Sequence, residues 1–194
     1  MQLEMIISQR QHLIGLNNNR KLNINIMINI KISMLKNERF WIGTTRFNNK
    51  TFNENMVWRK KHDWKGCIYG VDKYMSTHPK ASAPNGLIYV LEMNNETNKI
   101  MGIGIVRNKI NYDDKALINF TDRHYNKYIY HSKYRIDSSE FTERQKKYID
   151  ILEIILFKGQ GHFKRGNGIT ILKWESLLND EIISKFVRFF RSLF

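Results

Sequence analysis

Two apolar stretches joined by a short polar turn, residues 87–93 and residues 100–107, constrain the fold more than any other feature of this sequence. Both are rich in residues that favour β-strands, and the Asn-rich residues 94–99 between them are typical of a turn. The pattern predicts an antiparallel hairpin. The second strand carries Gly102 and Gly104 on one face. Because glycine weakens a strand, this face predicts either a bulge or barrel corner, or the close approach of another backbone, an aromatic ring or a ligand.

Other stretches with the composition of strands lie on both sides of the hairpin, at residues 40–47, 65–71, 116–120, 127–135 and 169–172. A strand-like pair is expected between the third and fourth of these. The strands dominate the middle of the chain, which favours the α+β class. We expect a small curled β-barrel with an inserted short helix and two C-terminal helices.

The three helical segments differ in the strength of their signals. Residues 48–55 predict a polar connection, and residues 54–64 predict a short basic helix or turn. Residues 143–157 predict the clearest helix, because a capping-box pattern precedes an apolar stripe. The capping pair is Thr142 and Gln145, and the stripe comprises Tyr148, Ile151, Leu152 and Ile155. Residues 174–194 predict a second amphipathic helix.

The first part of the chain differs in composition from the rest. Residues 1–33 are polar and Asn-rich and end in alternating Asn and Ile, which is typical of biased, low-complexity sequence. The alternatives are an edge strand, a disordered leader, or untranslated sequence upstream of a start at Met34. We expect a low-complexity leader over 1–33, disordered or not translated, and a single α+β domain over 34–194.

The charge balance points to a polyanionic partner. The chain has 32 Lys and Arg against 18 Asp and Glu, a formal net charge of +14. Such an excess attracts nucleic acid most commonly and an anionic membrane surface next. The alternative is compositional drift, because AT-rich codons produce Lys, Asn and Ile without selection for binding. Aromatic residues interleaved with the charges favour contact with nucleic acid.

Catalytic motifs are absent from the sequence. It has no phosphate-binding loop, no dinucleotide-binding glycine pattern and no nucleophile elbow. The single cysteine, Cys67, excludes an internal disulfide and is expected to be a buried apolar residue rather than a nucleophile. His124 and His131 are expected to be solvated surface residues rather than a metal pair. We therefore expect no cofactor and no metal site.

Acidic residues leave one enzymatic alternative open. A metal-dependent nuclease or base-processing enzyme needs carboxylates to hold its metal ion. Asp113, Asp114 and Asp137 are the candidates for that role. Because no second acidic cluster lies at a defined spacing from them, the sequence favours a protein that is not an enzyme.

A glycine-rich basic segment over residues 158–168 is the first candidate binding site. Glycines let backbone N–H groups approach an anion closely, and neighbouring cations add affinity for phosphates. The alternative is a flexible connection between a helix and a strand. We expect Lys158, Lys164 and Arg165 to contact phosphates.

Aromatic residues around the basic residues 54–64 form the second candidate site. Trp58 and Trp64 flank Arg59, Lys60 and Lys61. Large rings beside a cationic run are the combination that proteins use to bind single strands, since bases stack on rings while cations neutralise phosphates. The alternative is that each ring packs in the core.

The order of these elements resembles the PUA-like superfamily that includes the EVE, YTH and ASCH domains. The likeness covers residues 40–135 and rests on three features: an opening strand with Trp41, a Trp-bearing helical insertion, and the Gly-rich second strand of the hairpin. It implies a curled five- or six-stranded barrel whose cleft takes RNA or a flipped, often modified, base between aromatic rings. Trp41, Trp58 and Trp64 would then be the pocket rings. The chain departs from the family at Leu87, where the family has Asp, and in its helices after residue 142.

These observations together predict a nucleic-acid-binding module for RNA or DNA that recognises a flipped or modified base. The alternatives are the metal-dependent enzyme and a viral structural or packaging protein, since the composition resembles that of proteins from large AT-rich DNA viruses. No apolar run reaches the ~18 residues that a membrane span requires. With no secretory signal at the N-terminus, we expect a soluble protein inside the cell, in the host cytoplasm or nucleus if it is viral.

Overall fold

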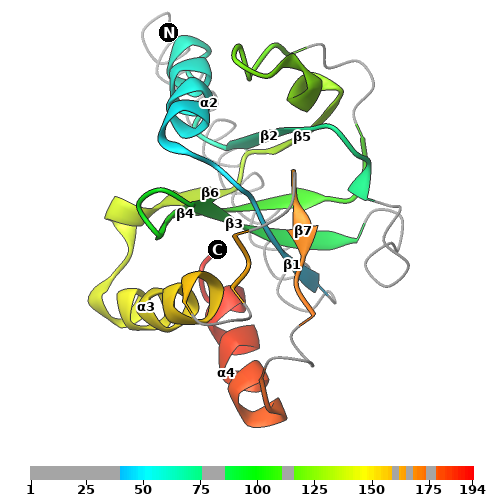
Figure 1. The fold of residues 1–194 in the computed structure, drawn as a ribbon. Helices are drawn as coiled ribbons and strands as arrows, with labels where there is room; N and C mark the ends of the chain where they lie inside the picture. Colours follow the sequence, from blue (N-terminus) through cyan, green and yellow to red (C-terminus); the bar gives the residue numbers. More distant parts are fainter. Residues whose placement is uncertain (1–39, 76–85, 111–115, 159–161, 165–167, 174–177) are drawn as a thin grey trace, which may run out of the picture. The chain divides into compact units, whose positions relative to one another are not determined.

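The predicted hairpin forms the centre of a five-stranded sheet. Its strands are β3 (Leu87–Asn94) and β4 (Lys99–Arg107), and the sheet has the order β6-β4-β3-β1-β7 (Figure 1). The other members are β1 (Phe40–Thr44), β6 (Arg135–Asp137) and β7 (Thr170–Ile171). β1 runs parallel to β3, whereas the pairs β1–β7, β3–β4 and β4–β6 are antiparallel. Every residue of β3 is buried, so the hairpin supplies the core of the domain.

The structure is a computed structural model that describes residues 40–75, 86–110, 116–158, 162–164, 168–173 and 178–194. They all belong to one unit, Arg39–Phe194, and the class is α+β, as expected. The expected leader over 1–33 and the domain start at Met34 lie outside the described residues.

A two-stranded sheet joins the larger sheet through β4. It consists of β2 (Cys67–Val71) paired antiparallel with β5 (Tyr128–Ser132). Where the chain passes from β5 to β6, the Ile105 N–H of β4 donates to the Tyr134 carbonyl at 3.1 Å. The Ser132 hydroxyl also donates to the Ile105 carbonyl. The prediction of a strand pair between 116–120 and 127–135 was wrong, because the first stretch forms no strand and the second pairs with β2 and β4.

The glycine face of β4 shows the close approach that was one of the two expected alternatives, and the β3–β4 pairing also shifts register between Leu91 and Met93. A Cβ atom on Gly104 would lie 2.2 Å from the Tyr69 hydroxyl and 2.6 Å from the Cys67 Cβ. A Cβ atom on Gly102 would lie 2.7 Å from an Arg135 guanidinium nitrogen. The absence of side chains on this face therefore lets β2 and β6 side chains lie directly against β4.

The basic helix begins earlier than predicted. Helix α2 spans Asn49–Lys61, so residues 49–55 are helical rather than a polar connection. Asn48 caps the helix by accepting from the Thr51 N–H at 2.7 Å, and Thr51 completes a capping box. An Asn–Thr pair satisfies the first-turn donors as a Ser–Glu pair does, but its sequence signal is weaker.

The two later helices pack together. Helix α3 (Glu143–Phe157) has the predicted Thr142–Gln145 capping box. Its buried stripe differs from the prediction, since Ile151 is 47% exposed while Ile149, Leu152 and Leu156 are buried. Helix α4 (Asp180–Arg191) is shorter than the predicted 174–194, and part of the difference lies outside the described residues.

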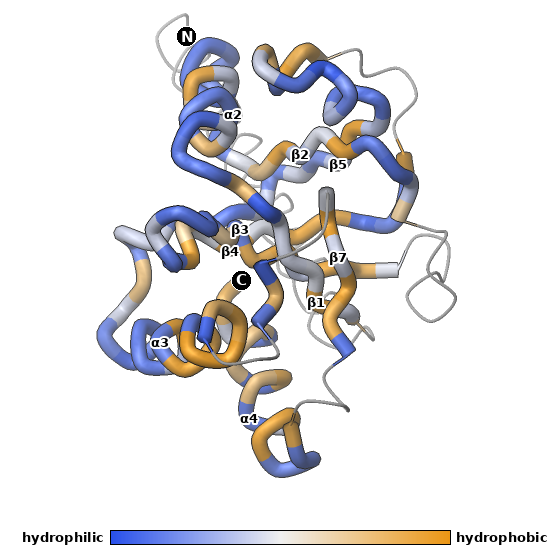
Figure 2. Tube along the Cα trace, in the orientation of Figure 1, coloured by the Kyte–Doolittle hydropathy of each residue, from blue (hydrophilic) through white to orange (hydrophobic). Residues whose placement is uncertain are grey.

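Aromatic rings fasten α4 to the rest of the fold. The Tyr148 ring of α3 stacks on Phe189 at 4.8 Å, and Phe190 lies 5.4 Å from the Tyr89 ring of β3. Figure 2 shows hydrophobic residues along parts of α3 and α4, whereas α2 is mainly hydrophilic. Two short 3-10 helices complete the described elements, η2 (Arg123–Asn126) and η3 (Ser138–Glu140). None of the helices in the described ranges is long and apolar enough to cross a membrane.

We predict that Gly104→Ala destabilises the fold. The new methyl group would overlap Tyr69 and Cys67, which are both buried, so the cost should be about 1–3 kcal/mol. Denaturant unfolding followed by circular dichroism measures this change. Thr97→Ala in the exposed β3–β4 turn is the control and should change the unfolding free energy by less than about 0.5 kcal/mol. Equal stability of the two variants would contradict the close packing at Gly104.

Candidate nucleic-acid interface

A cleft with a volume of about 860 Å³ lies between α2 and the segments that follow β5 and α2. We call it the basic cleft. Its lining contains five cationic and three acidic side chains. The residues are Asn53, Met56, Val57, Arg59, Lys60, Asp63, Trp64, Lys65, Lys133, Arg135, Asp137 and Glu140.

Internal ion pairs leave the cleft with a net positive surface. Lys65 pairs with Asp63 at 2.8 Å. Because both side chains are highly exposed, this ion pair contributes little to stability. Lys60 and Lys133 are exposed, and within the part of the chain that the structure describes neither makes an ion pair. These two ammonium groups are therefore the ones most accessible to a bound phosphate.

The C-terminus of α2 places Trp64 beside Arg59. Asp63 adopts a left-handed backbone conformation with φ 45°, which reverses the chain. The Trp64 N–H then donates to the Arg59 carbonyl at 2.8 Å, and the Asp63 N–H donates to the Lys60 carbonyl at 3.3 Å. This pair of hydrogen bonds is the Schellman arrangement, which brings the residue after the turn back onto the last helical turn. The sequence therefore sets a ring next to two cations by local structure alone.

The Trp64 ring is half-buried and held in place. Its indole N–H donates to the Cys67 carbonyl at 3.1 Å, and its edge meets the His131 ring at 5.6 Å. It also packs against a small cluster of buried residues on β2, β5 and the preceding loop, namely Ile68, Ile118 and Ile129. A ring fixed in this way offers a preorganised stacking surface at low entropic cost.

Arg59 is oriented by a buried amide. Its Nε–H donates to the Asn55 side-chain oxygen at 3.0 Å, and the Asn55 amide nitrogen donates to the Ile68 carbonyl at 2.6 Å. Burial and the charge of Arg135 lower the pKa of Arg59, whereas the charge of Glu92 opposes this shift. The Arg59 guanidinium therefore has a fixed position and gains stability from any added anion.

The inner end of the basic cleft is a buried ion network. Arg135 donates from Nη2 to Glu92 Oε2 at 2.7 Å and from Nη1 to Asp137 Oδ2 at 2.9 Å. The Tyr69 hydroxyl donates to Glu92 Oε1 at 2.9 Å. Burial alone would lower the pKa of Arg135, but the adjacent Glu92 carboxylate outweighs it and raises the value. Burial and the same carboxylate raise the pKa of Tyr69, which stays a neutral donor.

Asp137, one of the candidate metal ligands, is engaged in this network. Burial opposes its ionisation, but the Ser139 N–H and the Arg135 guanidinium outweigh it and lower the pKa of Asp137. Asp113 and Asp114 lie outside the described residues. Among the residues that are described, no three His, Cys, Asp or Glu side chains are grouped so that they could hold a metal ion.

A second, smaller pocket lies on the other side of α2, and we call it the inner pocket. Its volume is about 360 Å³, and it is enclosed by the end of β1, the start of α2, β2, η2 and the segment before β7. The lining residues are Thr45, Arg46, Phe47, Asn48, Thr51, Asn55, Tyr69, Gly70, Val71, Asn119, Thr121, Asp122, Tyr125, Gly168 and Ile169.

Glycine and charge give the inner pocket its character. A Cβ atom on Gly70 would lie 2.0 Å from the Tyr125 carbonyl, so η2 approaches β2 closely only because Gly70 has no side chain. Burial lowers the pKa of Arg46 to about 10, and this guanidinium donates to the Thr45 carbonyl at 2.7 Å. Burial, Asp72 and Asp122 raise the pKa of Tyr125. The pocket thus combines the Arg46 guanidinium, the Asp122 carboxylate, two phenols and several amides and hydroxyls.

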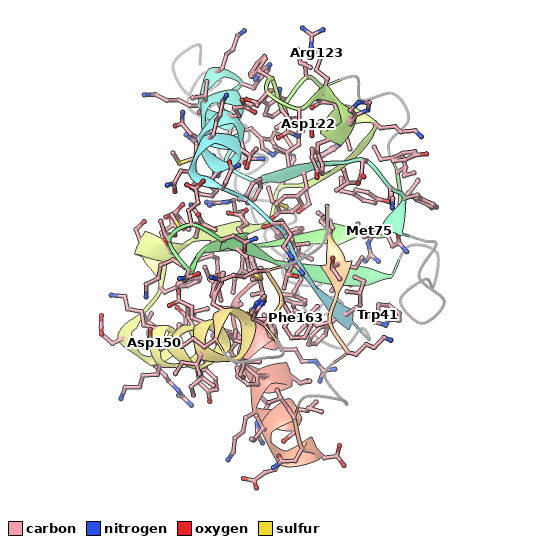
Figure 3. All side chains as sticks on the ribbon, viewed as in Figure 1. Trp41, Met75, Asp122, Arg123, Asp150 and Phe163 are labelled. Carbon is pink, nitrogen blue, oxygen red and sulfur yellow. The ribbon has the colours of Figure 1, made fainter. Side chains whose placement is uncertain are left out.

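The structure groups only some of the predicted binding residues. Arg59, Lys60 and Trp64 line the basic cleft together, whereas Trp58 and Lys61 line a different groove beside it. Trp41 of β1 packs against the main core cluster, and Figure 3 shows it far from Asp122 of the inner pocket.

The residues of the glycine-rich segment that were expected to contact phosphates do not join either site among the described residues, although Gly168 lines the inner pocket. Lys158 is exposed directly after α3, and Lys164 uses its carbonyl to accept from the Asn95 side chain at 3.0 Å. Neither residue lines the basic cleft or the inner pocket, and Arg165 lies outside the described residues.

Sequence reasoning missed several residues of both sites. Lys65 and Lys133 join the basic cleft, and Arg46 and Tyr125 join the inner pocket. Lys133 stands next to a run of tyrosines in a strand-like stretch, which gave no sign that it faces α2. Arg46 lies two residues before the helix cap Asn48. A correct prediction of the first residue of α2 would therefore have placed Arg46 at a strand-to-helix junction.

Comparisons with known proteins give no family for this chain. No protein-family model matches the sequence. No curated protein and no solved structure is significantly similar to it.

We predict that the Cys67 thiol does not react in the folded protein. The side chain is fully buried, and burial raises the pKa of Cys67 to about 11, so the thiol stays protonated and inaccessible at neutral pH. A chromogenic disulfide reagent at about pH 8, below the pKa of an ordinary thiol, should titrate no thiol before denaturant is added and one afterwards. Fast reaction of the native protein would contradict this packing of β2 against β4.

Proposed function

We propose that this chain is a nucleic-acid-binding module with a PUA-like curled barrel. The observation that carries the proposal is the basic cleft, where Arg59 and Lys60 meet Trp64 and Lys133. Exposed cations beside a fixed ring match the two needs of a single strand, neutralised phosphates and a stacking surface for a base. The junction of the two sheets at β4 supports the barrel, because it continues hydrogen bonding from one sheet to the other.

In this proposal the basic cleft holds the strand and the inner pocket holds one base. Lys60, Lys133 and Arg59 neutralise phosphates, and a base stacks against Trp64. A flipped base of the same nucleic acid enters the inner pocket, whose volume of about 360 Å³ lies in the range of small-ligand sites. There the Asn119 amide lies beside the base edge, and Tyr125 offers a ring.

The aromatic C-terminal helix does not favour the packaging alternative. Docking through α4 would need exposed rings, but Phe186, Phe189 and Phe190 are buried within the fold. Their contacts with Tyr148 and Tyr89 use the aromatic surface internally. The engaged Asp137 likewise gives no support to the metal-dependent enzyme.

The first test of the proposal is electrostatic. The affinity for a short single-stranded oligonucleotide should fall steeply as salt rises, because binding releases counterions. Lys60→Glu combined with Lys133→Glu should weaken binding and reduce the slope of log K against log salt by about 2. Fluorescence anisotropy over a salt series measures both quantities.

A matched pair of lysines controls for net charge. Lys146→Glu with Lys185→Glu makes the same charge change on α3 and α4, which contribute nothing to the lining of the basic cleft. This variant should keep most of the affinity. An equal loss in both variants would show that binding depends on overall charge and not on the basic cleft.

The second test addresses the inner pocket. Tyr125→Ala should weaken binding of an oligonucleotide with one unpaired base by about 1–3 kcal/mol, the usual value for loss of a base-stacking ring. Tyr125→Phe keeps the ring and should bind nearly as well as the unchanged protein. If Tyr125→Ala binds normally while the salt dependence holds, the basic cleft acts alone and no base enters the pocket.

A further inference from the structure

Large exposed apolar side chains gather at one place on the described surface. Six such residues are exposed among the described residues, and three of them, Val57, Leu117 and Phe120, line one groove of about 310 Å³. Their exposed fractions are 51%, 42% and 54%. The other lining residues of this apolar groove are Trp58, Lys61, His62 and Ala116. Apolar groups that gather in this way indicate an interaction surface rather than chance exposure.

The loop that forms one wall of the groove is rigid. Ile118 between the two exposed side chains is fully buried against Ile68 and Ile129. The Ile118 and Asn119 N–H groups both donate to the Asn126 side chain, at 2.8 Å and 2.9 Å.

The same loop is tied to α2. The Phe120 N–H donates to the Glu54 carboxylate of α2 at 3.1 Å, and the Thr121 N–H donates to the same carboxylate at 3.1 Å. Leu117 and Phe120 are thus held outward by the fold, and a partner would not have to order them on binding.

The floor of the groove is an aromatic stack. The Trp58 and His62 rings lie 4.1 Å apart and nearly parallel, at 19°. The His62 Nδ1 lies 2.7 Å from the Trp58 carbonyl, which fixes the imidazole over the indole. The last turn of α2 adds the exposed cation Lys61 to the lining of the groove.

We propose that this apolar groove docks an acidic, amphipathic segment of another protein. Large apolar side chains of the segment would contact Val57, Leu117 and Phe120, while its Asp or Glu residues would lie near Lys61. The chain carries a formal net charge of +14, which favours the approach of an acidic partner. This inference does not rest on the proposed nucleic-acid function, although Val57 also borders the basic cleft.

The same features disfavour two other occupants. A second copy of this chain would bring the Lys61 edges of two strongly basic molecules together, and like charges repel. A nucleobase would find no hydrogen-bond partner for its edges in Val57, Leu117 and Phe120, so stacking alone would have to hold it in the groove.

Three synthetic peptides of about 15 residues, the minimum length for a marginally stable isolated helix, test the proposal. The first has a Leu face and Glu elsewhere, the second replaces Glu by Lys, and the third replaces Leu by Gln. Fluorescence anisotropy with the full chain should give saturable binding of the first peptide only. Phe120→Ser and Leu117→Ser should each weaken it by roughly tenfold or more, as expected for loss of an interface anchor. Lys61→Glu should also weaken it.

Exposed residues elsewhere provide the matched control. Ile154→Ser changes a side chain on α3 that is 55% exposed, and it should leave peptide binding unchanged. Because all the substituted side chains are exposed, the variants should keep the fold, and circular dichroism verifies this. Lys61→Glu tests the charged edge without altering the apolar wall.

Three results would overturn the proposal. The first is no saturable binding of the acidic Leu peptide, and the second is equal binding of the basic peptide. The third is a loss of oligonucleotide affinity in Phe120→Ser as large as its loss of peptide affinity, which would assign the groove to nucleic acid. Failure of the basic-cleft variants to affect oligonucleotide binding would instead count only against the proposed function.

Discussion

The fold depends on one buried ion pair, between Arg135 of β6 and Glu92 of β3. Their side chains are only 5% and 1% exposed, and the Tyr69 hydroxyl of β2 completes the contact. Burying two charges costs free energy that the pair repays only through good geometry and further hydrogen bonds. Here the Arg135 guanidinium donates to both oxygens of the Glu92 carboxylate. The Tyr69 hydroxyl and the Asp137 carboxylate supply the further hydrogen bonds. Gly102 and Gly104 of β4 leave the space in which this network lies.

This network also determines where the binding residues lie. Fixing Tyr69 against β4 sets the position of β2, and β2 carries the Cys67 and Ile68 carbonyls. Those carbonyls accept from Trp64 and from Asn55, which in turn orients Arg59. Hydrogen bonds joined by the β2 backbone therefore connect the buried Glu92 carboxylate to Trp64 and Arg59 of the basic cleft. These two side chains are held in place by contacts that begin in the core.

The sequence was sufficient for features that depend on neighbours along the chain. The hairpin and the Thr142 cap of α3 each need only a few consecutive residues, and the two glycines of β4 predicted either a close neighbour or a bulge. Trp64 and Arg59 meet for the same reason, through the helix end at Asp63. Lys133 joins them only because β5 pairs with β2, a contact between residues far apart in sequence. No local pattern encodes that pairing, and the expected partner of β5, residues 116–120, instead forms the wall of the apolar groove.

Helix α2 explains why three surfaces meet in one region. Only Phe52 and Asn55 of this helix are buried, so most of its side chains are free to line other features. Asn48 and Thr51 border the inner pocket, Arg59 and Lys60 the basic cleft, and Trp58 and Lys61 the apolar groove. A helix with so little buried apolar surface contributes little hydrophobic stabilisation of its own. It is retained by specific contacts, through Asn55 to β2 and through Glu54 to the loop at Phe120. Its place in the fold is therefore best understood through the surfaces that it builds.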